Sequence, residues 1–138
     1  MNLNSKKIVF IGAGSMAEAI IKGLISQSTS SAQNITATNQ KNHERLQELA
    51  EKYGIQYADN AENKEAAIRQ ADLILLAMKP KDAVHALEDI RSYVTPEQLI
   101  VSVIAGLSTV SIHDILGFQA PVVRTMPNTS SAIGLGAT

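Results

Sequence analysis

Two glycines near the start of the chain have a spacing that suits phosphate binding. Residues Gly12 to Ala17 read Gly-Ala-Gly-Ser-Met-Ala, a G-x-G-x-x-A pattern directly after the apolar run 8–11. In such a strand–turn–helix unit the first glycine permits the tight turn, the second lets the backbone approach a pyrophosphate, and the small last residue lets helix and strand pack closely. The helix start also offers unpaired N–H groups to phosphates. The pattern predicts dinucleotide binding; the alternative is a purely structural turn.

The residues after the second expected strand bear on which dinucleotide would bind. An NAD site usually has an Asp or Glu here to hold the ribose 2′-hydroxyl, and that acid would repel a 2′-phosphate. Residues 38–42 include no acid; Asn39 can donate a hydrogen bond to phosphate, Lys41 adds positive charge, and Arg45 lies one helical turn further on. Alternatively, Asn39 caps the helix and Lys41 is a solvated surface residue, and both interpretations can hold together. We expect NADP, with NAD still possible.

The sequence offers few groups for acid–base, nucleophilic or metal chemistry. It has no cysteine, which excludes disulfides, thiolate zinc sites and a cysteine nucleophile. The three histidines, His43, His85 and His113, lie on expected helices without the spacing of a Ser/His/Asp triad or a metal site. We therefore expect no catalytic residue and no metal site in this chain, and surface or structural roles for the histidines.

The elements that position these residues follow from the hydrophobic pattern. Short apolar runs alternate with longer amphipathic segments, which is typical of βαβ units and a parallel sheet. We expect strands at 7–11, 34–38, 55–58, 73–77, 99–104 and 121–124. We expect helices at 15–27, 62–70 and 81–92, a helix that begins at 41 or 42 and ends at 53, and one that begins at 108 or 109 and ends at 116. The apolar side of the first helix is expected to include Met16, Ala19, Ile20, Leu24 and Gln27, and that of the fourth Ala83, Val84, Leu87 and Ile90.

These elements predict an α/β fold with a doubly wound, mostly parallel, Rossmann-like sheet in the strand order 3-2-1-4-5-6. The 138 residues, 45% of them hydrophobic, suit a single domain spanning 1–138 with a packed core. A net charge of −1 and 4% aromatic residues argue against nucleic acid or an anionic membrane as a partner. No apolar run approaches the roughly 20 residues needed to span a bilayer. The absence of cysteine and the near-neutral charge favour a cytoplasmic location.

Four separate segments together resemble one enzyme family. They are Phe-Ile-Gly-Ala-Gly-Ser-Met-Ala at 10–17, Leu-Ala-Met-Lys-Pro at 76–80, Val-Ser-Val-Ile-Ala-Gly at 101–106 and Val-Arg-Thr-Met-Pro-Asn-Thr at 123–129. In this order they resemble the N-terminal domain of pyrroline-5-carboxylate reductase, the last enzyme of proline biosynthesis. The resemblance covers essentially the whole chain, and its Ala-x-Lys-Pro and Met-Pro-Asn-Thr segments are far more specific than the glycine pattern.

The resemblance implies roles for residues outside the glycine turn. Residues 77–80 would line the ribose and diphosphate, with Met78 replacing the family's Val, although Lys79 could simply be a surface lysine. The backbone of 103–105 would meet the nicotinamide side, where Ile104 departs from the family's Ala and affects packing more than binding. Asn60 is expected to contact the adenosine, and Asn63 is an equally arguable match. The expected cofactor-binding residues are Ile11, Gly12, Ala13, Gly14, Ser15, Met16, Asn39, Lys41, Asn60, Ala77, Met78, Lys79, Pro80, Val103, Ile104 and Ala105; those expected near the substrate are Met126, Asn128 and Thr129.

The reaction implied by the resemblance is hydride transfer from NADPH to the C=N carbon of 1-pyrroline-5-carboxylate, giving L-proline. An iminium substrate is already activated, so no strong general acid is required, and the hydride chemistry belongs to the cofactor. In the family a second, helical domain follows, builds the dimer and holds the small-molecule substrate. We therefore expect this chain alone to bind NADP(H) without measurable reductase activity, and the full-length protein to be a homo-oligomer.

Two other functions remain open from the sequence. The glycine turn and Ala-x-Lys-Pro could serve another NADP-dependent reductase of the same superfamily, acting on a 3-hydroxy acid or a deazaflavin, although Met-Pro-Asn-Thr argues against this. The chain could also be a non-catalytic regulatory domain that binds a dinucleotide and responds to it.

Overall fold

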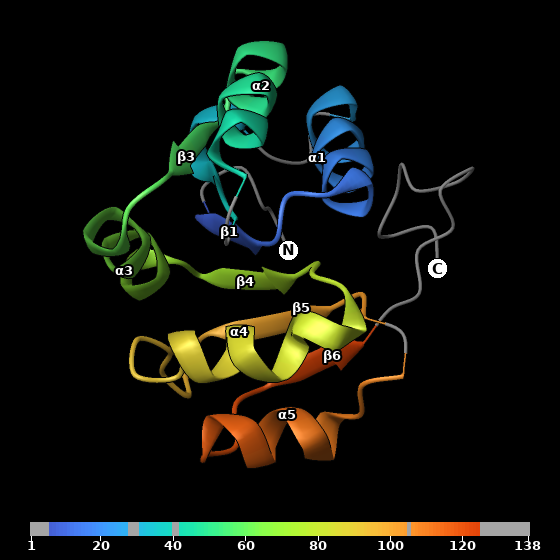
Figure 1. Ribbon diagram of the computed structural model, residues 1–138, viewed down its shortest axis with the longest axis vertical. Helices are drawn as coiled ribbons and strands as arrows, with labels where there is room; N and C mark the ends of the chain where they lie inside the picture. Colours follow the sequence, from blue (N-terminus) through green and yellow to red (C-terminus); the bar gives the residue numbers. More distant parts are fainter. Residues whose placement is uncertain (1–5, 28–30, 40–41, 105, 125–138) are drawn as a thin grey trace.

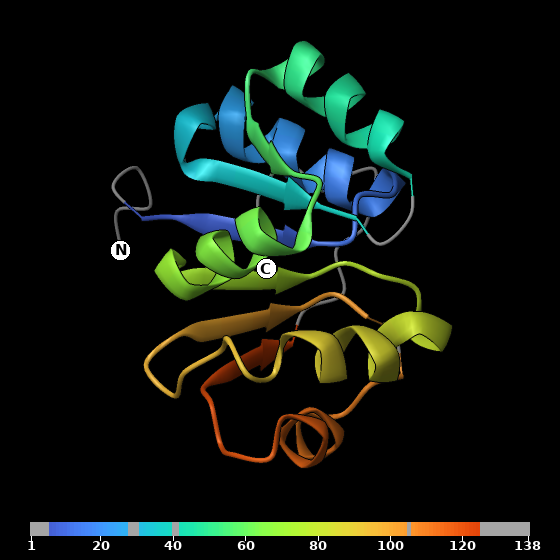
Figure 2. The ribbon, with the colours of Figure 1, turned by 60° about the vertical axis from the view of Figure 1, so that its left-hand side comes forward.

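A parallel β-sheet runs through the molecule and carries helices on both faces (Figures 1 and 2). The computed structural model describes residues 6–27, 31–39, 42–104 and 106–124. Its six strands lie in the order β3-β2-β1-β4-β5-β6, and every neighbouring pair is parallel. The strands are β1 (Ile8–Ile11), β2 (Ile35–Thr38), β3 (Gln56–Ala58), β4 (Leu73–Leu76), β5 (Leu99–Ser102) and β6 (Val122–Arg124). The predicted fold class and strand order are confirmed.

The central strand β1 shows why its sequence is apolar throughout. Ile8 and Phe10 belong to one buried cluster, which lies against α1 (Ser15–Ser26) and α2 (His43–Tyr53). Val9 and Ile11 belong to a second cluster, on the opposite face of the sheet. Successive side chains of a strand point to opposite faces, so a strand covered on both sides needs apolar residues at every position.

The second cluster lies against three helices, α3 (Ala61–Gln70), α4 (Ala83–Ile90) and α5 (Thr109–Leu116). Short 3₁₀ turns precede β2 at Ala32–Asn34 and α4 at Pro80–Asp82. No helix in the described ranges is long and apolar enough to cross a membrane.

Local capping residues set where several helices begin and end. The side chains of Asn42, Asn60 and Ser108 each accept a hydrogen bond from the backbone N–H three residues further on, and so begin α2, α3 and α5. Gly54 and Gly117 follow α2 and α5 with φ of 76° and 87°, a left-handed conformation that glycine adopts without steric cost.

Two residues expected on buried helix faces are exposed. Val84 has 52% of its surface exposed, because the buried positions of α4 are Ala83, Leu87 and Ile90 and the next residue along a helix is rotated by about 100° from that stripe. Gln27 is also exposed, since α1 ends at Ser26.

Two expected elements differ from the observed ones by two residues at one end or at both. The strand expected over 99–104 ends at Ser102, although Val103 and Ile104 remain buried. The helix expected over 81–92 begins as the 3₁₀ turn that Pro80 opens, and its α-helical part is Ala83–Ile90. Proline suits the first position of such a turn because it has no N–H to satisfy and its φ is already suitable.

Candidate functional site

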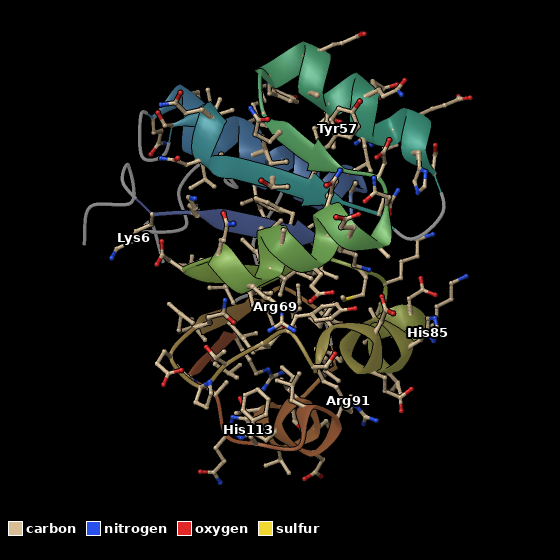
Figure 3. The ribbon with its side chains drawn as sticks, turned by 90° about the vertical axis from the view of Figure 1, so that its left-hand side faces the viewer. Lys6, Tyr57, Arg69, His85, Arg91 and His113 are labelled. Atoms are coloured by element: carbon tan, nitrogen blue, oxygen red, sulfur yellow. The ribbon has the colours of Figure 1, made fainter. Side chains whose placement is uncertain are left out.

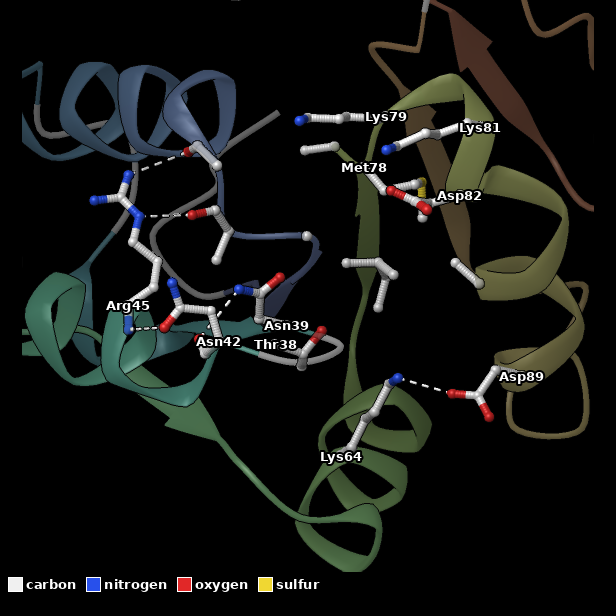
Figure 4. A pocket seen from close by; sticks show the side chains of 16 residues that line it. Thr38, Asn39, Asn42, Arg45, Lys64, Met78, Lys79, Lys81, Asp82 and Asp89 are labelled. Carbon is white, nitrogen blue, oxygen red and sulfur yellow. Dashed lines mark hydrogen bonds and ion pairs between the residues drawn. The ribbon is translucent and has the colours of Figure 1, made fainter.

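A hollow of about 510 Å³ lies where β1, β2 and β4 end (Figure 4). In the strand order, β2 flanks β1 on one side and β4 flanks it on the other, so the winding of the chain changes direction there. In open α/β sheets, ligands bind in the crevice at this switch point. The hollow is lined by Ile11, Gly12, Ala13, Gly14, Thr38, Asn39, Asn42, Arg45, Lys64, Ala77, Met78, Lys79, Lys81, Asp82, Ala86 and Asp89.

The two glycines of the turn have different reasons to be glycine. Gly12 has φ of +108°, and a Cβ there would lie 2.9 Å from backbone atoms of Ala77 and Met78. The fold itself therefore requires glycine at position 12. Gly14 has an ordinary φ of −83°, and a Cβ there would meet nothing within 4 Å. The described protein atoms give no reason for glycine at position 14, whereas a ligand approaching the backbone would.

The N-terminus of α1 adjoins the hollow without a capping side chain. Gly14 is its N-cap residue and supplies no side-chain hydrogen bond, whereas α2, α3 and α5 begin with capping side chains. The N–H groups of a helix's first turn have no partner within the helix, and together with the helix dipole they favour an anion. Ala17, the last residue of the glycine pattern, is fully buried against the sheet, as close helix–strand packing requires.

Among the described residues, the β2 side of the hollow carries amides and a hydroxyl group but no acid. Thr38 is buried and donates its Oγ1–H to the carbonyl of Phe10 at 2.8 Å. Asn39 lines the hollow and donates from Nδ2 to the carbonyl of Asn42 at 3.2 Å. The interpretation that Asn39 caps the helix is wrong, because Asn42 is the N-cap and its Oδ1 accepts from the backbone N–H of Arg45. The side chain of Asn39 is thus not used to cap α2, and it lines the hollow.

Arg45, whose charge the sequence places near the same edge, is already engaged. Its Nε donates to the carbonyl of Ala13 at 2.7 Å, and its guanidinium pairs with Glu18 at 2.7 Å and Glu48 at 2.6 Å. Glu18 also accepts from the Tyr53 hydroxyl at 2.7 Å. Lys52 also pairs with Glu18, at 2.9 Å. The hydrogen bond from Tyr53 has the largest effect on the pKa of Glu18, followed by those from Lys52 and Arg45, and together they lower it from 4.5 to about 2.

The β4 side supplies most of the remaining charge. Ala77, Met78 and Lys79 follow β4, and Lys81 and Asp82 come from the turn before α4. Four cationic side chains, Arg45, Lys64, Lys79 and Lys81, and two acidic ones, Asp82 and Asp89, line the hollow. Its charge is therefore net positive, which suits a phosphate-bearing ligand.

Lys64 on α3 reaches Asp89 on α4 at 2.9 Å, so an ion pair joins these two helices at one side of the hollow (Figure 4). Lys64 is mostly covered, whereas the side chain of Asp89 is 54% exposed. Within the described part of the chain, Lys79 and Lys81 make no such ion pair. Two of the four cations therefore have their charge available to a ligand.

The remaining expected site residues are not among those that line the hollow. Ser15 and Met16 lie in the first turn of α1, next to the hollow, and Pro80 begins the 3₁₀ turn beside it. Val103 and Ile104 are buried and do not line the hollow; the N–H of Val103 donates to the carbonyl of Leu76. Asn60 caps α3 outside the hollow, and Asn63 lines a smaller hollow beside β2 and β3. Lys41, Ala105, Met126, Asn128 and Thr129 lie outside the described residues.

Sequence reasoning did not assign a cofactor role to Thr38, Asn42, Lys64, Lys81, Asp82, Ala86 or Asp89. Thr38 and Asn42 flank Asn39, and Lys81 and Asp82 directly follow Lys79-Pro80, so proximity in sequence could have suggested them. Lys64, Ala86 and Asp89 reach the hollow from α3 and α4, and no motif marks them.

No cluster of three or more His, Asp or Glu side chains suited to a metal ion occurs among the residues that the structure describes. His113 on α5 contacts the carbonyl of Ala120 at 2.8 Å, which supports a structural role, and His85 is exposed on α4 (Figure 3).

The strand order and the hollow at its switch point define a Rossmann-like α/β protein. A family model described as "NADP oxidoreductase coenzyme F420-dependent" matches residues 7–106, and the chain belongs to that family. Pyrroline-5-carboxylate reductase 1 of Bacillus spizizenii is 49% identical over 135 residues, which cover 98% of this chain and 44% of that protein. The resemblance inferred from the four segments is thus confirmed.

Solved structures support the same relationship. A pyrroline-5-carboxylate reductase from Coxiella burnetii superposes with a TM-score of 0.83 at 30% identity, covering 94% of this chain and 47% of that chain. The Plasmodium falciparum pyrroline carboxylate reductase with NADP bound has a TM-score of 0.75 at 23% identity and covers 95% of this chain and 45% of that one, a likeness of fold alone. The chain spans less than half the length of these relatives.

Proposed function

We propose that this chain is the cofactor-binding part of a pyrroline-5-carboxylate reductase, which reduces 1-pyrroline-5-carboxylate to L-proline with NADPH. The proposal is supported by the 49% identity to a reductase of that name across 98% of the chain. It is also supported by the family description, which names NADP. The chain spans less than half of such relatives, so the activity is proposed for a protein that contains this chain.

The observation that carries cofactor binding is the space at Gly14. A Cβ at this position would meet no protein atom within 4 Å, and the uncapped first turn of α1 begins there. This is the arrangement that a pyrophosphate needs, because its oxygens can accept hydrogen bonds from backbone N–H groups only where no side chain intervenes. Lys79, at the rim of the same hollow, would offset phosphate charge.

NADP is favoured over NAD by the chemistry of the β2 side. Asn39 stands at the position where NAD sites usually carry an acid, and no described residue from that side of the hollow is acidic. The Nδ2 of Asn39 can donate to a 2′-phosphate, and Lys41 is proposed to add positive charge nearby. The contacts proposed for Asn60, Val103, Ile104 and Ala105 rest on the resemblance alone.

In the proposed reaction the cofactor supplies the hydride, and this chain binds and orients it. In the part of the chain that the structure describes, no histidine or tyrosine lines the hollow as a general acid. This fits a C=N substrate whose protonated nitrogen already activates the carbon. Met126, Asn128 and Thr129 are proposed to lie near the substrate. Substrate contacts beyond this chain, a homo-oligomeric full-length protein and a cytoplasmic location belong to the same proposal and rest on the resemblance.

Titrating NADPH and NADH into the 138-residue chain, followed by calorimetry, tests cofactor binding. We expect NADPH to bind at least about 3-fold more tightly than NADH, because its 2′-phosphate adds charge-assisted hydrogen bonds. The matched variant Asn39→Asp should reverse that preference. Absence of binding by either dinucleotide, or a clear preference of the unaltered chain for NADH, would contradict the proposal. Proline formation by a protein containing this chain tests the reaction, and coenzyme F420 as the only productive hydride donor would contradict it.

A further inference from the structure

A network of charged side chains lies behind the glycine turn. Arg45 and Lys52 on α2 both bind Glu18 on α1, and Tyr53 donates its hydroxyl hydrogen to the same carboxylate. We infer that Arg45 is a positioning residue for pyrophosphate binding, because it orients the peptide groups of the turn without contacting the ligand. This inference rests on the proposed binding of a dinucleotide in the hollow.

The hydrogen bonds of Arg45 reach the two carbonyl groups of the turn. Its Nε lies 2.7 Å from the carbonyl oxygen of Ala13, and its Nη2 lies 3.4 Å from that of Gly14 (Figure 4). The carbonyl of Gly14 also accepts the N–H of Glu18 at 3.0 Å, which is the first hydrogen bond of α1. The side chain of Arg45 thus joins the turn to the beginning of the helix.

The orientation of these carbonyls fixes the direction of the neighbouring N–H groups. A trans peptide unit is planar, and its C=O and N–H point in opposite directions. When the Ala13 carbonyl is held toward the guanidinium, the Gly14 N–H is directed away from it, and the Gly14 carbonyl likewise directs the Ser15 N–H. These are the donors that a pyrophosphate at the start of α1 would use. Arg45 therefore acts on the ligand through two peptide planes.

The guanidinium has little freedom to serve the ligand directly. It is paired with Glu18 at 2.7 Å and Glu48 at 2.6 Å, and its side chain is only 21% exposed. Glu18, itself 22% exposed, is held in turn by Lys52 at 2.9 Å and Tyr53 at 2.7 Å. Rotating Arg45 toward a 2′-phosphate would break the planar, multiply bonded arrangement for which arginine is suited. The structure thus favours positioning over direct phosphate contact.

The two roles predict different ligand selectivity. The pyrophosphate is common to NADPH and NADH, so a positioning role requires Arg45→Met to weaken both by the same factor, about 10-fold for two misdirected donors. A direct contact with the 2′-phosphate would weaken NADPH alone. The affinity for 2′-AMP, which has a 2′-phosphate but no pyrophosphate, should stay within about 2-fold of that of the unaltered chain.

The experiment measures the dissociation constants of these three ligands for the 138-residue chain and its variants by calorimetry. Arg45→Lys keeps the charge but cannot bond the turn and Glu18 in one plane, so it should resemble Arg45→Met. Glu65→Gln removes a surface ion pair with Arg69 on α3, and neither residue lines the hollow, so it serves as the matched control and should leave all three affinities within about 2-fold. Buried Gln98 donates to the carbonyls of Ile68 and Ala71 and does not line the hollow, so the destabilising variant Gln98→Leu controls for loss of stability. Each titration is made below the unfolding temperature of the variant.

Three outcomes would overturn the inference. Loss of NADPH affinity alone would show that Arg45 contacts the 2′-phosphate, and unchanged affinity for both dinucleotides would show that the turn is oriented without it. Equal weakening of both dinucleotides by Gln98→Leu would show that the effect reflects stability. Absence of dinucleotide binding by the unaltered chain would instead overturn the proposed function, and the inference with it.

Discussion

Replacing Gly12 and Gly14 separately with alanine should affect different properties of the protein. Gly14→Ala places a methyl group where no described atom lies within 4 Å, at φ of −83° and ψ of −165°. Loss of glycine at an N-cap costs about 0.5 kcal/mol, and the reduced freedom of the unfolded chain returns about 0.4 to 1 kcal/mol. The free energy of unfolding should therefore stay within about 1 kcal/mol of that of the unaltered chain.

Gly12→Ala should be strongly destabilising. The left-handed conformation, with φ of +108°, costs a residue with a Cβ about 1 to 2 kcal/mol, and the contact at 2.9 Å with the Ala77 backbone adds about 1 to 3 kcal/mol. At about 2.1 cal/mol/K per residue over 138 residues, the resulting loss of about 2 to 5 kcal/mol lowers the melting temperature by roughly 7 to 17 °C.

Gly14→Ala, the variant expected to keep its stability, should be the one that loses affinity for the ligand. We expect Gly14→Ala to weaken NADPH binding at least about 10-fold, because its methyl group occupies the approach of the pyrophosphate. Urea unfolding followed by circular dichroism, together with calorimetric titration of NADPH, measures both quantities on the same samples. Unaltered NADPH affinity in Gly14→Ala, a stability loss above about 2 kcal/mol in that variant, or full stability of Gly12→Ala would each refute the reasoning.

Two further predictions concern stability. The pKa of Glu18 is lowered from 4.5 to about 2 by the hydrogen bond from Tyr53 and by Lys52 and Arg45, so its stabilisation is present above pH 4.5 and is lost as the pH falls toward 2. Glu18→Gln should be about 1 to 2 kcal/mol less stable than the unaltered chain at pH 7, a figure reduced for solvent screening, and this difference should disappear as the pH falls below about 2. Urea unfolding from pH 7 to below about pH 2 checks the prediction, and a difference independent of pH would contradict it. Gln98→Leu should lose about 2 to 3 kcal/mol in urea unfolding, because buried Gln98 bonds the carbonyls of Ile68 and Ala71 and the N–H of Thr95; a loss below about 0.5 kcal/mol would contradict that role.

The fold was predictable because its local patterns and its packing require the same residues. An apolar residue at every position of β1 indicated a strand buried on both faces, and the glycines after it indicated the turn. Val84 was misplaced because the apolar character of a residue does not fix which side of a short helix faces the sheet; only packing against neighbouring elements does.

The site was predictable only where its residues directly follow a strand. Gly12, Gly14 and Asn39 follow strands that end at the same edge of the sheet, so their positions follow from the strand order. Lys64 and Asp89 come together because α3 and α4 lie on the same face of the sheet, which no local pattern encodes. The sequence likewise placed the charge of Arg45 close to the end of β2, but the direction of its side chain depends on Glu18, 27 residues away in the chain.

The division of each central strand between two buried clusters has a consequence for how the protein unfolds. Ile8 and Phe10 serve one helical layer and Val9 and Ile11 the other, so neither layer can separate without exposing a strand that the other needs. The two helical layers are therefore thermodynamically coupled through the strands that they share, and unfolding should be a single cooperative transition. Arg45 approaches the hollow from the first layer and Asp89 from the second. Cooperativity thus makes the two sides of the hollow form together and disappear together.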